Sequence, residues 1–318
     1  MNTQDSRICA ACRNVLVGRY CHGCGQDSTA KPVPLREMAI EVATSYSPLD
    51  GKAARTLAIL LVRPGRLLEA YREGAGSLYV TPLKLFIVAT TLFLAVLNFS
   101  DTTLFQFTWK VDTPGQPLQA VYDPESMEIS VVGATSEDRW LQARVEPAID
   151  PEVTAAIEKG AREAADEVTR ANMAYELVLN AEQARLAERL SGWLPNVLWL
   201  LMPLYAAGLV PLFGRRRLFL EHVIFAMWAH AAAFVLAMAM AALNAWGANL
   251  SAVLLTLPYL AYFTIAAARY YAMSPLQALW RGVLHLAFYV FLVLLPAVLV
   301  ILATVTDWSA FVTWLRSV

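Results

Sequence analysis

Residues 250–268 read LSAVLLTLPYLAYFTIAAA and contain no charged side chain. A helix needs roughly 17–25 predominantly apolar residues to cross about 30 Å of hydrocarbon, and this stretch is long enough. A second uncharged run covers Leu286–Thr306. The 318-residue chain is 58% hydrophobic and only 16% charged, whereas average soluble domains carry about 25% charged residues. The composition therefore predicts an integral membrane protein.

Five segments meet this length criterion, so we predict a mainly α-helical membrane fold with about five transmembrane helices. They lie near residues 82–99, 194–213, 218–243, 251–268 and 283–305. The last four form an expected transmembrane domain over 193–306. The chain starts with a polar segment instead of a cleavable signal peptide, so we expect the first span to act as its own insertion signal.

Basic residues predict the topology of these spans. Arg215, Arg216 and Arg217 lie between the second and third spans, and Arg269 and Arg281 flank the loop between the fourth and fifth. The positive-inside rule makes both loops cytoplasmic. The N-terminus is then expected inside and the C-terminus outside.

The charge distribution agrees with this topology. Residues 1–83 hold ten Lys and Arg against seven Asp and Glu, a balance of +3. Residues 99–192 hold eight against seventeen, a balance of −9. Such a split is typical of segments on opposite sides of a membrane.

Cys9-Ala-Ala-Cys12 and Cys21-His-Gly-Cys24 hold all four cysteines of the chain. Four thiolates at this spacing suit a closed tetrahedral zinc site with no position open for substrate. Disulfides are disfavoured in a reducing compartment. Iron is the main alternative metal, and a redox dithiol is the competing chemistry, although the βαβ context of a thioredoxin is absent. We predict a zinc ribbon over residues 1–30 that is a structural or docking module.

Residues around the cysteines refine this prediction. Gly25 and Asn14 are expected to adopt tight turns whose backbone N–H groups support the thiolates. Zinc ribbons can bind nucleic acid, but the three arginines here are partly offset by two aspartates, so nucleic acid is an improbable partner. These residues are Arg7, Arg13, Arg19, Asp5 and Asp27.

Residues 31–81 are expected to form amphipathic helices on the cytoplasmic face. Apolar residues at helical spacing predict a first helix before Asp50, and a second helix is expected over 52–62. Pro64 fits the first turn of a third helix, which Gly74 and Gly76 are expected to end. The first spacing comprises Leu35, Met38, Val42, Tyr46 and Leu49, and the arginines available to anionic headgroups are Arg55, Arg63, Arg66 and Arg72. The alternative is a small soluble bundle packed on the ribbon.

Residues 100–192 are expected to form an extracytoplasmic α+β insertion. Phe105, Phe107, Trp109 and Val111 alternate with polar residues, which predicts a half-buried strand. Residues 127–132 are its expected partner strand. A heptad spacing then predicts a long helix within 151–190, which forms either a self-associating stalk or an intramolecular hairpin. The heptad positions are Ile157, Ala161, Ala164, Val168, Ala171, Tyr175 and Val178. An interfacial helix is expected over 307–318.

A small set of ionisable residues lies within the expected spans: Glu221, His222, His230 and His285. Such residues are costly in a membrane, which favours a functional role such as binding a proton, a metal or a headgroup. The alternative is a set of interfacial histidines satisfied by their neighbours. A bis-histidine haem site fits less well, because residues eight apart differ by about 80° around a helix. HExxH, GxSxG and P-loop signatures are absent from the sequence.

Several short motifs resemble a bacterial membrane-protein family catalogued as domain of unknown function 3667. They are Tyr20-Cys-His-Gly-Cys-Gly-Gln26, Asp50-Gly51 before Thr56–Leu61, Arg63-Pro64-Gly65, Tyr71-Arg-Glu-Gly74, Tyr79 with Pro82, and Glu221-His222 with His230. The resemblance implies a zinc ribbon joined to a multi-pass membrane domain. It implies no activity.

Taken together, these patterns predict a non-enzymatic protein of the bacterial inner membrane. Its cytoplasmic zinc ribbon, held by Cys9, Cys12, Cys21 and Cys24, would dock a protein partner or brace the membrane domain. Self-association through residues 151–190 is a further expectation. The competing class is a transporter, channel or membrane enzyme that uses Glu221 and the three histidines of the spans.

Overall fold

The computed structural model describes residues 8–9, 12–29, 34, 36–38, 40, 51–74, 79–112, 114–214, 217–291, 295 and 299. The chain divides into two compact units. Unit 1 comprises Met1–Leu94, Leu198–Met238 and Val253–Pro296. Unit 2 comprises Ala95–Val197, Ala239–Ala252 and Ala297–Val318.

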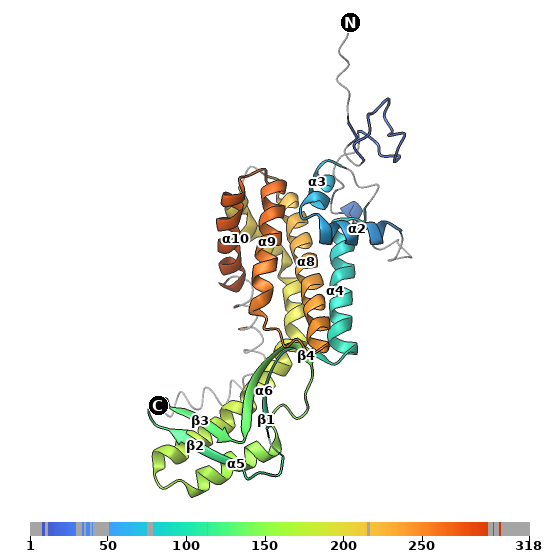
Figure 1. Cartoon of the computed structure of the whole chain (residues 1–318). Coiled ribbons are helices and arrows are strands. Elements are labelled where there is room, and N and C mark those ends of the chain that lie inside the picture. The colour runs from blue at the N-terminus through green and yellow to red at the C-terminus, as the bar shows by residue number, and fades with distance from the viewer. Residues whose placement is uncertain are drawn as a thin grey trace. The chain divides into compact units, whose positions relative to one another are not determined.

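The apolar helices dominate unit 1. Among the described residues, three helices are long and apolar enough to cross a membrane: α4 (Pro82–Phe99), α8 (Phe219–Ala245) and α9 (Val253–Tyr270). They run side by side with α10 (Pro275–Tyr289), as Figure 1 shows. The shorter α7 (Met202–Phe213) is also apolar. These three candidate spans agree with the membrane character predicted from composition.

Aromatic side chains fill the interior of this helical unit. Phe225 and Phe263 are fully buried and meet edge to face with their ring centroids 5.1 Å apart. Trp228 of α8 stacks on Tyr262 of α9 at 5.1 Å. Such ring pairs have preferred geometries, so they fix how neighbouring helices pack.

One of the five expected spans differs from the prediction, and another is described only in part. The second, 194–213, is divided, because α6 (Glu167–Leu200) ends at Leu200 and α7 begins at Met202. Pro203 stands in the first turn of α7, where its missing N–H is tolerated, whereas inside a continuous helix it would break the hydrogen-bond ladder. The fifth is described through α10, and most of its remainder lies outside the described residues. The expected helix over 307–318 and the basic pair 215–216 also lie outside them.

The helices before the first span also differ in part. α2 (Gly51–Val62) matches the expected second helix. α3 (Arg66–Arg72) starts two residues after Pro64, because Gly65 adopts a left-handed conformation with φ of 82°. Gly74, also left-handed, ends α3 as predicted. Most of the expected helix over 35–49 lies outside the described residues.

α3 packs its apolar face against other parts of unit 1. Leu67 and Leu68 are fully buried, and the Arg72 guanidinium donates a 2.6 Å hydrogen bond to the carbonyl of Tyr270 at the end of α9. At least one N–H group of Arg72 is therefore bound to protein. α2 differs, because Leu57 and Val62 are exposed. The position of both helices on the membrane surface stays a prediction.

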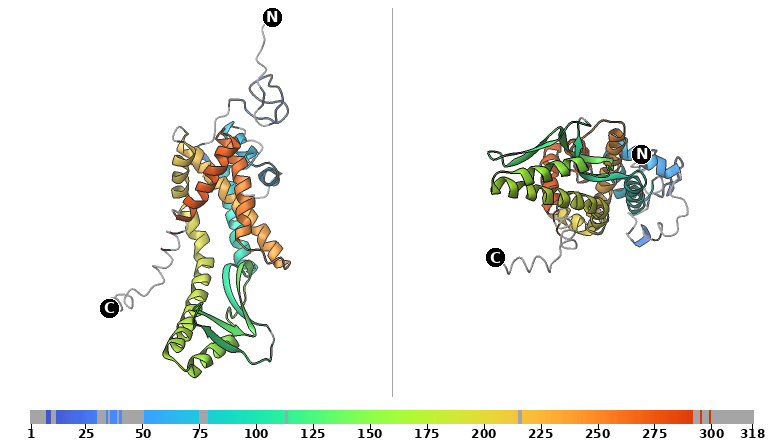
Figure 2. Two further views of the ribbon diagram at one scale, coloured as in Figure 1. Left: turned by 60° about the vertical axis from the view of Figure 1, so that its left-hand side comes forward. Right: turned by 90° about the horizontal axis from the view of Figure 1, so that it is seen from below.

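Unit 2 contains two antiparallel strand pairs (Figure 2). β1 (Thr102–Val111) pairs with β4 (Ala134–Ala143), and β2 (Gln119–Asp123) pairs with β3 (Glu128–Val132). The predicted partnership of β1 with 127–132 is wrong, since the turn at 124–127 joins β3 to its neighbour in sequence. The predicted polar face of β1 is exposed only at Lys110. Gln106 and Thr108 are buried, and their side chains donate hydrogen bonds to the carbonyls of Val145 and Glu137.

α5 (Pro151–Glu163) and α6 cover one side of these strands (Figure 2). A single helix through 151–190 is not formed: Ala164 is extended, and the Asp166 carboxylate accepts a 2.7 Å hydrogen bond from the Thr169 N–H to cap a new helix. The shared core contains Trp109, Ala120, Val131, Val153, Ala156, Ile157 and Met173. Packing within the chain, one of the two expected outcomes, thus holds for the first heptad positions. Val168, Tyr175 and Val178 are exposed, so self-association stays a prediction.

Candidate metal centre

The four cysteines are carried by two loops with the same backbone hydrogen bonds. In the first loop the Cys9 N–H donates to the carbonyl of Asn14 at 2.8 Å, and in the second the Cys21 N–H donates to the carbonyl of Gln26 at 2.9 Å. Each loop is thus closed five residues after its first cysteine. We call residues 8–29 the four-cysteine module.

A left-handed residue closes each turn directly after the second cysteine. Gly25 has φ of 74°, as its predicted role requires, and its N–H donates to Cys21. In the first loop the corresponding residue is Arg13, with φ of 67°, whose N–H donates to Cys9. The left-handed position thus lies at Arg13, one residue before the predicted Asn14, whereas the backbone N–H of Asn14 bonds the Cys12 thiol as predicted. Both loops place the left-handed residue directly after their second cysteine. This shared geometry decides the position, although asparagine adopts a left-handed conformation at lower cost than arginine.

The four sulfur atoms converge, all within 4.8 Å of one another. The Sγ atoms of Cys9 and Cys24 are 3.7 Å apart, and those of Cys12 and Cys21 are 3.5 Å apart. All four cysteines are free thiols. In a tetrahedral zinc site with Zn–S bonds of about 2.3 Å, neighbouring sulfurs are about 3.8 Å apart. The donor set and its spacing therefore fit one tetrahedral metal ion.

Hydrogen bonds and burial give the thiols of Cys21 and Cys24 different pKa values. Burial raises the pKa of Cys21, but the backbone N–H groups of Gly23 and Cys24 and the thiols of Cys12 and Cys9 outweigh it and lower the pKa to about 6. Burial raises the pKa of Cys24 to about 12. A metal must displace the remaining thiol protons to bind four thiolates, so binding releases protons.

The surroundings of the loops carry little net positive charge. Arg19 forms an ion pair with Asp27 at 2.9 Å, and this side-chain hydrogen bond holds the pKa of Asp27 well below its usual range. Arg13 is exposed, and Arg7 lies outside the described residues. Among the described residues of the module, Arg19 is therefore paired and Arg13 is an exposed arginine.

The module contacts the end of α3 through Gln26. The sequence motif over residues 20–26 includes this residue but predicts no role for its side chain. The Gln26 amide is buried and donates a 2.8 Å hydrogen bond to the carbonyl of Gly74, which ends α3. Its second acceptor is the carbonyl of Asp27 at 3.0 Å. Sequence spacing could not reveal this pairing, because the two residues are 48 positions apart.

Glu221 and His222, at the start of α8, have different partners. The Glu221 carboxylate lies 3.6 Å from Arg217 and accepts a 3.1 Å hydrogen bond from the Leu218 N–H. His222 is fully buried, and its Nδ1 lies 3.0 Å from the Tyr271 hydroxyl. Glu221 thus has its partners among neighbouring residues, as the simpler of the two interpretations expects, whereas Nε2 of His222 is buried without a hydrogen-bond partner in the described part of the chain.

His230 and His285 are linked through Tyr205 of α7. The Tyr205 hydroxyl lies 3.2 Å from Nε2 of His285, and its ring meets that of His230 edge to face at 4.7 Å. The Tyr259 hydroxyl also lies 3.2 Å from Nε2 of His285. His285 stacks on Phe263 with ring centroids 4.2 Å apart. The sequence did not single out these tyrosines, because tyrosine in an apolar run has an ordinary interfacial explanation.

The four predicted residues of the spans therefore form no common ligand set. Among the described residues, the four cysteines are the one group of three or more His, Cys, Asp or Glu side chains whose ligand atoms lie close enough to hold a metal ion.

Comparison with known families gives one match. Residues 50–94 match the family described as protein of unknown function (DUF3667), which confirms the predicted resemblance over that segment. The segment holds α2, α3 and most of α4. No curated protein matched the chain, and no solved structure did so.

Proposed function

We propose that this chain, with its DUF3667 segment at residues 50–94, is a non-enzymatic multi-pass protein of the bacterial inner membrane. Its four-cysteine module binds one zinc ion and serves as a cytoplasmic docking or regulatory module. The observation that carries this proposal is the approach of four free thiols to within 4.8 Å of one another. Four protein ligands leave no open position for a substrate, which is the pattern of structural zinc sites.

Contacts inside unit 1 support a cytoplasmic position for the module. Gln26 bonds to Gly74, Arg72 bonds to Tyr270, and the Tyr270 hydroxyl bonds to the carbonyl of Glu221 at 3.2 Å. These bonds bring the module, the end of α9 and the start of α8 to one end of the helical unit. Arg217 and Arg269 belong to the same helix ends. Basic residues mark the cytoplasmic side, which favours the N-terminus inside.

The alternative class of transporter, channel or membrane enzyme has less support. Glu221 and His222 are engaged with Arg217 and Tyr271, so they are not gathered with His230 and His285 around one reactive point. A docking role needs no such point, because the exposed surface of the module, including His22, is available to a partner.

Metal analysis of the purified full-length protein tests the metal site. We expect about one zinc per chain for a single four-thiolate centre. Cys21→Ser should lose most of that zinc, whereas His22→Ala should retain it, because His22 is exposed and is not one of the four clustered ligands. Full zinc in the cysteine variant, or iron in place of zinc in the parent protein, would refute the assignment.

A crosslinking experiment in cells tests the docking role. The full-length protein and Cys21→Ser are crosslinked and purified, and the proteins bound to each are compared. We expect a partner that is lost with Cys21→Ser and kept with His230→Phe, which lies in the helical unit away from the cysteines. A phenotype abolished by His230→Phe and untouched by Cys21→Ser would instead favour the transporter or enzyme class. A C-terminal alkaline phosphatase fusion should be active if the C-terminus is extracytoplasmic.

A further inference from the structure

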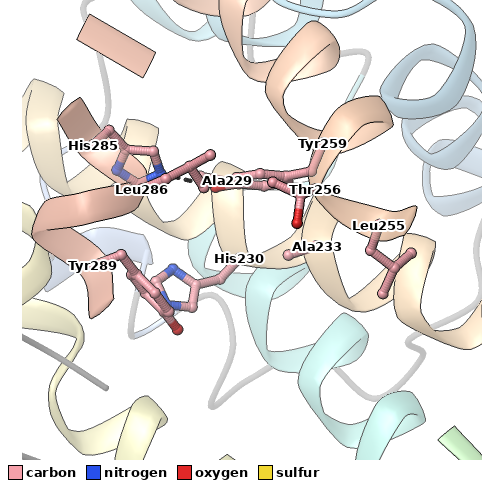
Figure 3. A pocket seen from close by; sticks show the side chains of 9 residues that line it. All are labelled: Ala229, His230, Ala233, Leu255, Thr256, Tyr259, His285, Leu286 and Tyr289. Carbon is pink, nitrogen blue, oxygen red and sulfur yellow. Dashed lines mark hydrogen bonds between the residues drawn. The ribbon is translucent and has the colours of Figure 1, made fainter. Parts of the chain in front are cut away.

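A cavity of about 220 Å³ lies between three helices of unit 1. α8, α9 and α10 contribute three side chains each, and Figure 3 shows those of α9 and α10 on opposite sides with His230 between them. The lining is Ala229, His230, Ala233, Leu255, Thr256, Tyr259, His285, Leu286 and Tyr289. The cavity thus combines aliphatic walls with four rings that carry polar atoms.

The size of the cavity suits one substituted ring. An apolar cavity of about 150 Å³ holds a benzene molecule, so about 220 Å³ leaves room for a short substituent. Tyr259, Tyr289 and His285 offer ring faces and edges, which favour an aromatic occupant.

His230 sets the polar requirement of the occupant. Its Nδ1 lies 3.0 Å from the carbonyl of Ala226, and since a carbonyl only accepts, Nδ1 carries the proton. In the neutral ring Nε2 is then an acceptor. The side chain is 5% exposed, and within the described part of the chain Nε2 has no hydrogen-bond partner. A buried acceptor without a donor is costly, so the site is complete only when a donor enters it.

The neutral form of His230 follows from its surroundings. No acidic side chain lines the cavity among the described residues, and an unpaired charge in such a setting is strongly disfavoured. The ring therefore selects a ligand that donates a hydrogen bond over one that only accepts.

We propose that this cavity binds a membrane-dissolved phenol, a single aromatic ring whose hydroxyl donates to Nε2 of His230. Thr256, which lines the cavity from α9, is exposed, so the site opens to the outside of the helical unit. An apolar ligand that partitions into the bilayer can reach the cavity by this path. The proposal is independent of the zinc module.

Equilibrium dialysis with the full-length protein in nanodiscs tests the proposal, with empty nanodiscs as the reference for lipid partition. The probes are 4-propylphenol and 4-propylanisole, which share the ring and the propyl group, but the ether has no hydrogen-bond donor. We expect the phenol to bind roughly tenfold more tightly, the effect of satisfying one buried acceptor. Equal binding of the two probes would overturn the proposal without any variant.

Two substitutions and a control locate the binding. His230→Phe should remove the preference for the phenol over the ether. Ala233→Leu should weaken the binding of both probes, because the larger side chain fills the cavity from α8. Ala261→Leu is the matched control, since Ala261 is exposed on α9 and does not line the cavity. If His230→Phe does not fold, Ala233→Leu decides: unchanged phenol binding to a folded Ala233→Leu protein would refute the site.

Discussion

The side-chain amide of Gln26 donates a 2.8 Å hydrogen bond to the carbonyl of Gly74, although 48 positions separate the two residues. The backbone carbonyl of Gln26 in turn accepts a hydrogen bond from the backbone N–H of Cys21, so the cysteine loop itself determines where Gln26 lies. Gly74 ends α3, whose Arg72 bonds to the last turn of α9. A continuous series of contacts therefore joins the cysteines to a candidate membrane span.

Gln26→Ala should loosen this connection. It leaves the buried carbonyl of Gly74 without its donor, which costs about 1–3 kcal/mol. We expect faster amide hydrogen exchange over 66–74 of the full-length protein in nanodiscs, measured by mass spectrometry. Ser28→Ala is the control, because Ser28 is exposed in the same loop. Equal exchange in the two variants would show that the bond contributes nothing to the docking of the module.

Gly65→Ala should destabilise the packing of α3 on α9. Gly65 has φ of 82°, and a Cβ there would lie 3.0 Å from the Cα of Ala266 and 3.2 Å from the Cβ of Arg269. Strain and close contact with backbone should together cost about 1–3 kcal/mol. Thermal unfolding of the purified protein measures the loss. Gly192→Ala is the contrasting variant, because nothing lies within 4 Å and alanine favours a helix, so a neutral or slightly stabilising effect is expected.

Gly208 of α7 allows close contact with Phe288 of α10, which can be tested by compensation. A Cβ at Gly208 would lie 1.5 Å from the Cζ atom of Phe288, so Gly208→Ala cannot be accepted without movement of that ring. We expect Gly208→Ala to lower the melting temperature by several degrees. The double variant Gly208→Ala with Phe288→Leu should recover most of the loss. Additive losses in the double variant would contradict a direct contact.

The membrane helices could be predicted from sequence because their signal is local. The expected segment 82–99 coincides with α4, and the segments 218–243 and 251–268 agree with α8 and α9 within two residues at each end. Length and apolar composition decide such helices, and both can be counted along the chain. The cysteine spacing was equally informative, since two short loops bring the four thiols together.

Other features depend on contacts between distant residues and were not predictable in the same way. The alternation in β1 suggested one exposed face, but the polar side chain of Gln106 is buried because it serves the backbone at Val145. The pairing of β1 with β4 spans a hairpin that the sequence does not mark. Likewise, the hydroxyl of Tyr205 reaches His285 across 80 positions.

Gln106 offers a test of this buried polar contact in unit 2. Its amide donates to the carbonyl of Val145 at 2.7 Å, and its carbonyl accepts from the Val145 N–H at 2.9 Å. Gln106→Leu leaves both backbone groups unpaired and should cost about 2–4 kcal/mol. Hydrogen exchange at Val145 in the full-length protein should accelerate strongly. Lys110→Leu, at an exposed position of the same strand, should leave that exchange unchanged.

Removing the metal should unfold the four-cysteine module and leave the helical unit intact. The described residues of the module form little regular structure, with isolated bridges between Ile8 and Val15 and between Tyr20 and Asp27. The proposed metal would therefore supply much of the folding energy of the module. We expect a strong chelator to raise hydrogen exchange over 12–29 to nearly that of an unfolded chain. Exchange over 66–74 should rise to the level of Gln26→Ala, because the same contact with Gly74 is lost. α8 should remain protected, since its core is built from helix–helix contacts such as Trp228 with Tyr262. A module that stays protected after chelation would contradict a structural metal, and loss of protection in α8 would show that the metal supports the whole of unit 1.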